Sequence, residues 1–425
     1  MSVAAKSPLR WIPSLYFVQG LQFFVVNRIA AFMLKNMGMD NEVITRWLGV
    51  IGMAWGVKWL WSPFLEMVRS KKRIVVAMQY LSAAGLGAMA LALQLPVWFA
   101  AAIGLLFLLA YASATHDIAC DGLYMGALDS KQQATFAGWQ GAFFNASKFL
   151  ILGGLLVLAG KLETGMGVAN AWTTIFGLLA VLLVGLASYN AYALPAAPNA
   201  QLGQLTLAGT WRLLLDVVVD LLRKPGIWMA LLFILLFRLG EAQTQTVGPL
   251  FLIEPRAKGG LGLTTEQIGG VYGTAGTLAF LVGSILGGYF TAWLGLRRAL
   301  PGLIVAMAVP SAVFYYLSVA LPDDLIRIGI AVAIENFTWG FGFVGVILFI
   351  MQVIAPGKFQ TAHYAIGSGV MAIGLSVPTS FSGDIQRALG YQDFFLWTLV
   401  CGLPALLLLF VLPLWRKPAP AAVAA

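Results

Sequence analysis

The stretch VWFAAAIGLLFLLAYASATHDIACDGLYMGA, residues 97–127, decides the class of fold. Its first part, residues 97–115, contains no charged residue, and as a helix it is long enough to cross a hydrocarbon core of about 30 Å. Three ionisable residues, His116, Asp117 and Asp121, follow within the same segment. The stretch therefore predicts a membrane-spanning helix that carries charge in its second half.

The composition of the whole chain points the same way. Of its 425 residues, 60% are hydrophobic and 10% are charged, against roughly 45–50% and 25% in soluble domains. A soluble fold cannot bury this much apolar surface, so a soluble enzyme or binding module is excluded. Apolar runs bounded by charge, Pro or Gly predict an all-α polytopic membrane protein with 12 transmembrane helices, at residues 11–34, 44–65, 74–94, 97–127, 133–159, 169–194, 226–253, 265–294, 299–320, 325–353, 359–385 and 393–414.

The longest break between spans, residues 195–224, divides the chain into six spans plus six. We expect an N-terminal six-helix half at 1–194, a cytoplasmic linker with an amphipathic helix at 195–224, and a C-terminal six-helix half at 225–425. Arg212, Asp216 and Asp220 follow at i, i+4 steps, which suits a helix at the membrane interface. The alternative is a simple cytoplasmic extension of the seventh span.

Basic residues indicate the orientation. With a cytoplasmic N-terminus, 15 Lys and Arg residues fall in cytoplasmic segments and 7 on the opposite side, so both termini should be cytoplasmic. The net charge of +9 then reflects cytoplasmic loops, and we expect no nucleic-acid partner. Cys120 and Cys401 lie in apolar runs, which favours buried thiols and no disulfide or metal site.

Nine ionisable residues fall inside the predicted spans. A charge near the bilayer centre costs about 2.5–3.5 kcal/mol, so eight unpaired charges would cost on the order of 20 kcal/mol, more than most folds can supply. Without His116, the set contains four positive and four negative charges, which predicts pairing across the bundle. The residues are Arg28, Lys58, His116, Asp117, Asp121, Lys148, Arg238, Glu241 and Glu335.

Asp117 and Asp121 are the densest acidic pair. They are i, i+4 neighbours and share a helix face, so they repel unless a cation lies between them or one is protonated. This arrangement suits proton or ion coupling, and we assign that role to Asp117, Asp121 and Glu335. The alternative for Asp121 is that it only caps the cytoplasmic loop.

The other charges need partners. Arg238 and Glu241, at i, i+3, should pair within one helix, in a structural or a ligand-binding role. Lys58 should meet an acidic residue of another helix. Glu335 should find Lys58, Lys148 or Arg238, or be protonated. Arg28 lies near the end of its span, where its side chain can snorkel to the interface.

Polar side chains in the spans extend this network. Amides can bond the hydroxyl groups of a sugar or peptide ligand, but they can equally hold helices together. The candidate substrate and charge network comprises Lys58, Lys148, Arg238, Glu241, Gln19, Gln22, Gln140, Asn145 and Gln243. The glycine-rich stretch WGFGFVG (339–345) indicates close helix packing, and the chain contains no P-loop pattern.

Five stretches resemble the muropeptide permease (AmpG-like) branch of the major facilitator superfamily. They are VKWLWSPFLE (57–66), SATHDIACDGLYM (113–125), LFRLGEAQ (236–243), AIENFTWGFG (333–342) and residues 359–368. The resemblance implies the major facilitator fold and a proton-driven importer that carries cell-wall sugar-peptides from the periplasm to the cytoplasm. Related branches carry siderophores or acetyl-CoA.

We therefore expect a secondary active, proton-coupled importer of a GlcNAc-containing saccharide or muropeptide that works by alternating access. The alternative within the family is an importer of a siderophore or other small organic acid. A remote alternative is a membrane-embedded enzyme acting on lipid-linked sugars, although no loop carries an acidic cluster. We expect a small-molecule substrate, no cofactor beyond the proton gradient, a monomer, and a location in the bacterial inner membrane.

Overall fold

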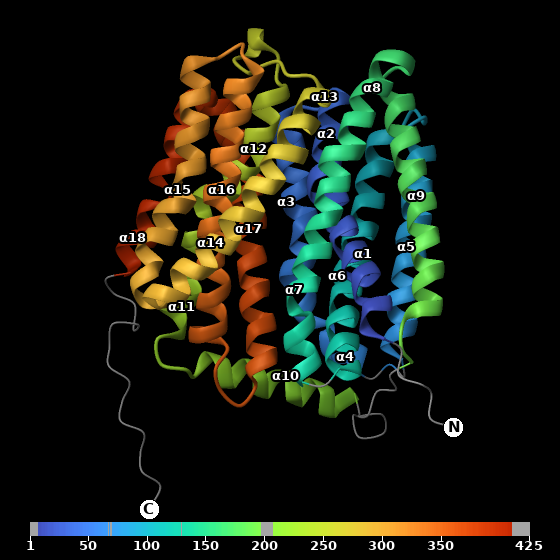
Figure 1. Cartoon of the computed structure of the whole chain (residues 1–425), viewed down its shortest axis with the longest axis vertical. Coiled ribbons are helices and arrows are strands. Elements are labelled where there is room, and N and C mark those ends of the chain that lie inside the picture. The colour runs from blue at the N-terminus through green and yellow to red at the C-terminus, as the bar shows by residue number, and fades with distance from the viewer. Residues whose placement is uncertain (1–6, 67, 69, 129, 197–206, 410–425) are drawn as a thin grey trace, which may run out of the picture.

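The protein is a bundle of long helices, described by a computed structural model over residues 7–66, 68, 70–128, 130–196 and 207–409 (Figure 1). The first half contains α1 (Ile12–Phe24), α2 (Ala30–Asn36), α3 (Asn41–Val57), α4 (Ser62–Glu66), α5 (Lys71–Ala92), α6 (Trp98–Ala127), α7 (Ser130–Lys148), α8 (Leu156–Met166) and α9 (Val168–Ala193). The second half contains α11 (Ile227–Phe237), α12 (Leu239–Ile253), α13 (Thr265–Ile268), α14 (Thr277–Leu294), α15 (Leu296–Ala320), α16 (Leu325–Phe349), α17 (Gln360–Val400) and α18 (Leu403–Leu409).

Ten segments of the described chain are helical, long and apolar enough to cross a membrane. The predicted all-α polytopic fold is confirmed, and twelve crossings are consistent with the segments. The last segment, Ala362–Leu409, contains a bend at Gly390, whose φ of 76° is outside the helical range, so it accommodates two crossings. The additional candidate is α3, which has 17 residues.

The predicted second span, 44–65, is not one continuous helix. α3 ends at Val57, a 3-10 turn covers Lys58–Leu60, and the short α4 follows. Pro63 lies in the first turn of α4 and explains the break, because a proline has no N–H to donate to the carbonyl group four residues earlier, as a continuous helix would require.

In the described part of the chain, four segments are π-helical: Val25–Ile29, Phe149–Leu155, Gly269–Gly276 and Ile350–Ile354. Such segments occur frequently at functional sites. Two of them touch across the halves, where Gly153 lies against the backbone of Gly273. The absence of side chains at these two residues lets the backbones approach.

Helix α10 (Leu207–Leu222) lies across one end of the bundle, here called the lower end (Figure 1). It buries Leu214, Val217 and Leu221, whereas Trp211 and Leu215 are exposed on another face. The N-terminal part of the predicted linker, residues 197–206, lies outside the described residues, as do the terminal segments 1–6 and 410–425.

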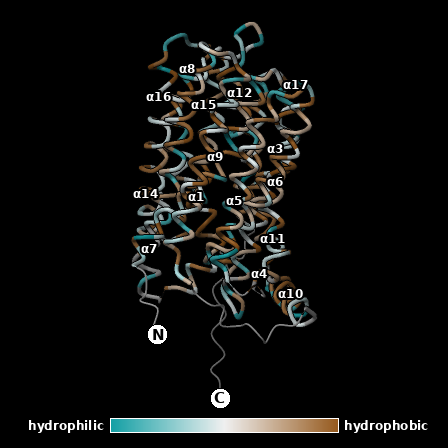
Figure 2. Tube along the Cα trace, turned by 90° about the vertical axis from the view of Figure 1, so that its right-hand side faces the viewer, coloured by the Kyte–Doolittle hydropathy of each residue, from teal (hydrophilic) through white to brown (hydrophobic). Residues whose placement is uncertain are grey.

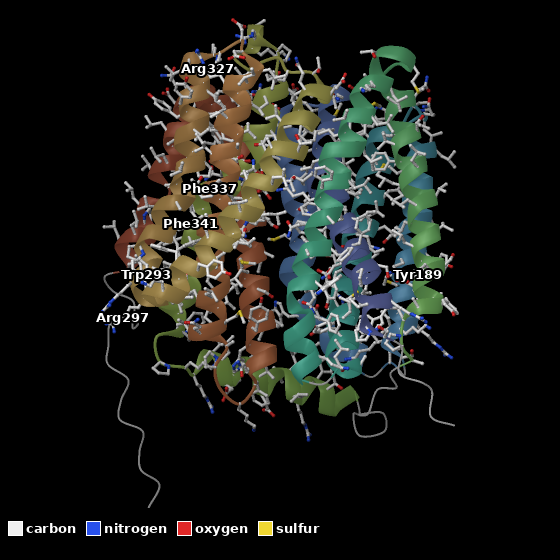
Figure 3. The ribbon with its side chains drawn as sticks, in the orientation of Figure 1. Tyr189, Trp293, Arg297, Arg327, Phe337 and Phe341 are labelled. Atoms are coloured by element: carbon white, nitrogen blue, oxygen red, sulfur yellow. The ribbon has the colours of Figure 1, made fainter. Side chains whose placement is uncertain are left out.

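The surface has the pattern of a membrane protein. Brown, hydrophobic stretches run along the helices in Figure 2, and hydrophilic loops gather at the upper end, opposite α10. Figure 3 shows Trp293 and Tyr189 at a similar height on opposite sides of the bundle, with Arg297 near the lower end and Arg327 at the upper end. Trp293 is 81% exposed and Tyr189 45%. Tryptophan and tyrosine at this position are typical of the membrane–water interface.

Four ion pairs among the described residues link the two halves at the upper end. Lys35–Glu254 (2.5 Å), Arg46–Asp384 (2.8 Å), Glu42–Arg387 (2.7 Å) and Lys161–Glu266 (3.7 Å) each join a residue of the first half to one of the second. Tyr391 reinforces the first pair by donating a hydrogen bond to Glu254 (3.0 Å) and accepting one from Asn41 (2.7 Å). The halves are therefore closed against each other at the upper end.

Glycine allows the closest contacts between helices of the second half, as the sequence predicts. A Cβ atom at Gly340 would meet the carbonyl oxygen of Phe280, and one at Gly287 would meet that of Phe341. Gly288, the next residue on α14, has open space where its Cβ would be.

We expect Gly287→Ala to destabilise the protein by about 1–3 kcal/mol, because the added methyl group must push α14 and α16 apart. Gly288→Ala is the matched control and should be neutral or up to about 1 kcal/mol stabilising, because alanine favours the helix. Thermal unfolding of the two purified variants in detergent measures the difference. Equal stability of both variants would contradict the packing role of Gly287.

Candidate functional site

A first cluster of polar groups lies in the first half, around Asp117 on α6. Asp117 is 8% exposed, and its Oδ2 accepts a hydrogen bond from Nζ of Lys58 at 3.4 Å. The predicted partner of Lys58 on another helix is therefore found. Gln19 and Trp55 lie beside the same carboxyl group. We call these four residues the Asp117 cluster.

Asp121 lies one turn further along α6, toward the lower end. Its side chain is exposed, in contrast to that of Asp117. It lies close enough to Lys58, and to Tyr364 of α17, for electrostatic interaction. One basic group thus faces two carboxyl groups on the same helix face, which is the arrangement that the i, i+4 spacing predicts.

A second cluster surrounds Glu335 on α16, which is fully buried. Both oxygens of its carboxyl group accept hydrogen bonds from amides, one from Gln245 of α12 and one from the adjacent Asn336, each at 2.5 Å. None of the basic residues predicted as partners, Lys58, Lys148 or Arg238, forms an ion pair with Glu335 within 4 Å in the described structure. Two amides bind the carboxyl group instead, because Gln245 lies on the facing helix α12 and Asn336 is the next residue on α16.

Two basic residues of the first half reach into the second cluster. Lys148, 3% exposed, lies at the end of α7 with its Nζ 4.6 Å from the ring centre of Phe280 and 5.1 Å from that of Trp339. Arg28 lies over the same Trp339 ring at 5.9 Å. Both interact electrostatically with Glu335. We call Arg28, Lys148, Gln245, Glu335 and Trp339 the Glu335 cluster.

The prediction that Arg28 snorkels to the membrane interface is wrong. Its guanidinium group donates hydrogen bonds to the backbone oxygen of Gln245 at 2.6 Å and to its Oε1 at 3.1 Å. Because Gln245 also binds Glu335, one amide side chain connects a basic residue of the first half to an acidic residue of the second.

Several buried polar atoms in and near the two clusters have no hydrogen-bond partner. They belong to Gln19, Gln22, Trp55, Asp117, Tyr272 and Trp339. An unpaired buried polar group costs about 1–3 kcal/mol, so these atoms are candidates for contacts with water or a ligand. These atoms come from both halves, so each half offers polar groups that a ligand could bind.

The remaining predicted site residues do not join these clusters. Arg238 and Glu241 form the predicted intrahelical pair, with two hydrogen bonds of 3.0 and 3.2 Å, and both are buried. Gln243 accepts a hydrogen bond from Trp397 at 3.2 Å within the second half. Asn145 bonds the carbonyl oxygen of Gly141 on its own helix, and Gln140 lies beside Tyr124.

Sequence reasoning missed Gln245 and Trp339 as site residues. Gln245 lies two positions after Gln243, and in a helix that spacing turns it to a different face, so only the structure tells which amide faces Glu335. Trp339 follows Glu335 at i+4, and this spacing is a usable signal, because it puts the ring on the same face as the carboxyl group.

Comparisons with known proteins identify relatives over most of the chain. No protein-family model matches it. The chain is 26% identical over 408 residues to a putative transporter AmpG 4 of Rickettsia conorii, which covers 93% of this chain and 94% of the relative. It is also 26% identical over 370 residues to the anhydromuropeptide permease of Escherichia coli, covering 85% of this chain and 71% of the relative.

Solved transporter structures share the fold at low identity. A bacterial homologue of the human lysosomal transporter Spinster, in an inward-facing and unoccupied conformation, aligns with a TM-score of 0.73, 12% identity and 97% of both chains. The nucleoside transporter NupG aligns with a TM-score of 0.68, 15% identity, 96% of this chain and 99% of the other. The chain is thus a multi-pass membrane protein with the major facilitator fold, similar over most of its length to AmpG-like muropeptide permeases, and the resemblance seen in its sequence is confirmed.

Proposed function

We propose that the protein is a secondary active importer that carries a GlcNAc-containing saccharide or muropeptide together with protons. The observation that carries the proposal is the pair of charged clusters, one in each half, with unpaired polar atoms in and near them. Two relatives bear names of the same kind, a putative transporter AmpG and an anhydromuropeptide permease. In this proposal the protein catalyses no chemical reaction, and it needs no cofactor beyond the proton gradient.

Asp117 is our candidate for proton transfer. The Lys58 ammonium group lies 3.4 Å from Oδ2, while Oδ1 has no partner. Protonation of Asp117 removes the attraction that holds Lys58, so the ammonium group is free to turn toward the exposed Asp121. Glu335 is the corresponding acid in the second half, where the amides of Gln245 and Asn336 hold it.

The position of the ion pairs between the halves supports alternating access. In the proposed cycle, the upper pairs such as Lys35–Glu254 and Arg46–Asp384 must separate before substrate enters from that side. The described conformation, closed above and with Asp121 exposed toward the lower end, then corresponds to the inward-facing state. We assign the upper end to the periplasm and both termini to the cytoplasm of a bacterial inner membrane, and we expect a monomer.

Uptake into vesicles tests the function, with the pH gradient acidic outside and, as a control, reversed. Vesicles containing the protein should accumulate labelled GlcNAc-anhydromuropeptide when the outside is acidic, because protons then flow inward with the substrate. A protonophore should reduce the accumulation to equilibrium. A siderophore panel run in parallel tests the alternative substrate class, and accumulation of siderophore alone would contradict the proposal.

Asp117→Asn should abolish uphill accumulation, because an amide cannot take up and release the proton. It should retain exchange of labelled for unlabelled substrate, since exchange needs no net proton movement. Counterflow and gradient-driven uptake are measured in the same vesicles. Asn145→Ala is the control, because its amide bonds only its own helix in the described structure. Full accumulation by Asp117→Asn would remove Asp117 from the coupling role.

The proposed orientation predicts on which side of the membrane each reporter fusion lies. Fusions after Lys72, Ala208 and Pro418 should report the cytoplasm, because basic segments stay on that side. Fusions after Asp40 and Asp324 should report the periplasm. Alkaline phosphatase and green fluorescent protein, active on opposite sides, give the readout. A periplasmic signal after Ala208 would contradict the division into six plus six spans.

A further inference from the structure

The second cluster contains more positive than negative charge. Lys148 and Arg28 approach it from the first half, and both interact electrostatically with Glu335; Arg28 also interacts with Glu241 of the same half as Glu335. Both oxygens of Glu335 are already bonded by Gln245 and Asn336. Among the residues that the structure describes, neither basic group forms an ion pair with a carboxylate within 4 Å. A buried cation without such a partner is expensive in a membrane, which makes it a candidate for binding an anion.

The free polar atoms nearby are donors. The indole N–H of Trp339 is buried without an acceptor. The hydroxyl group of Tyr272 lies beside Glu335. Lys148 and Arg28 can only donate, and Arg28 uses only part of its five N–H groups on Gln245. The two basic groups approach the same Trp339 ring, Lys148 at 5.1 Å and Arg28 at 5.9 Å from its centre.

We propose that Lys148 and Arg28, together with the N–H of Trp339, bind a carboxylate of the transported substrate. A planar carboxylate can accept two hydrogen bonds from a guanidinium group and a further one from an ammonium group. A neutral sugar hydroxyl group fits less well, because it cannot balance the positive charge of the two basic groups. This inference rests on the proposed transport function and assigns the acidic end of the substrate to the second half.

The first cluster has the complementary chemistry. Its unpaired atoms include the acceptors Oδ1 of Asp117 and Oε1 of Gln19, which suit hydroxyl or amide N–H groups. A substrate with a neutral sugar at one end and a carboxylate at the other would therefore contact both halves. A muramyl sugar without its peptide has this construction, since its lactyl carboxylate is free and is attached to an N-acetylated sugar.

Two matched probes test the carboxylate site: GlcNAc-anhydroMurNAc with its lactyl carboxylate free, and the same disaccharide with that group converted to a methylamide. Binding is measured by titration of the full-length protein in detergent. The wild type should bind the free acid about tenfold to hundredfold more tightly than the amide, the effect of a lost charge-assisted contact. Uptake of both probes into vesicles is measured separately and reports on the transport function.

Lys148→Met should lose this discrimination while its affinity for the amide stays within about twofold, and Lys148→Arg should keep most of it. The control is Lys358→Met, because Lys358 also contacts a ring, that of Phe359 at 4.9 Å, but is exposed. Equal affinity of the wild type for both probes, no binding of either, or retained discrimination in Lys148→Met would overturn the carboxylate site. Binding with discrimination but without uptake would leave the site standing and overturn the transport function.

Discussion

The cost of a charge in the membrane is the constraint on which this structure depends. A buried ionic group without a partner is costly, and the partners found here come from the same helix, from another helix of the same half, or from the other half. Arg238 and Glu241 satisfy each other within one helix. Lys58 and Asp117 connect two helices of one half. Arg28 crosses to Gln245 in the other half. The last kind of contact makes the electrostatics of one half depend on the position of the other.

This dependence gives charge a direct role in coupling. The Glu335 cluster is complete only while Arg28 and Lys148 of the first half lie beside Trp339. In the proposed cycle, separation of the halves on the upper side would withdraw these cations from Glu335 and change its preference for a proton. A bound anion would compensate the two cations. Proton and substrate would then act on the same charge balance, which is the requirement for obligatory coupling.

The sequence predicts those features that depend on spacing along one helix. The apolar runs predict the spans, and i, i+3 and i, i+4 steps predict the Arg238–Glu241 pair and the shared face of Asp117 and Asp121. Contacts between helices are beyond such reasoning. The position of Arg28 near the end of its span predicts that the side chain snorkels. Its actual contact with Gln245, which lies 217 residues away in the sequence, depends on how the helices pack. The break at Lys58 had a signal, since Pro63 follows within two turns.

The π-helical segments connect packing to the site. Gly153 and Gly273 bring the backbones of two such segments together, and Gly160 lies against Glu266 further up. Lys148 immediately precedes the first segment and Tyr272 belongs to the second. A π-helical turn shifts the residues after it relative to a regular helix, so it sets which face each side chain presents. The glycine contact therefore holds the end of α7, with Lys148, against the second half, so that even a small rocking motion about this contact would change the distance from Lys148 to Trp339.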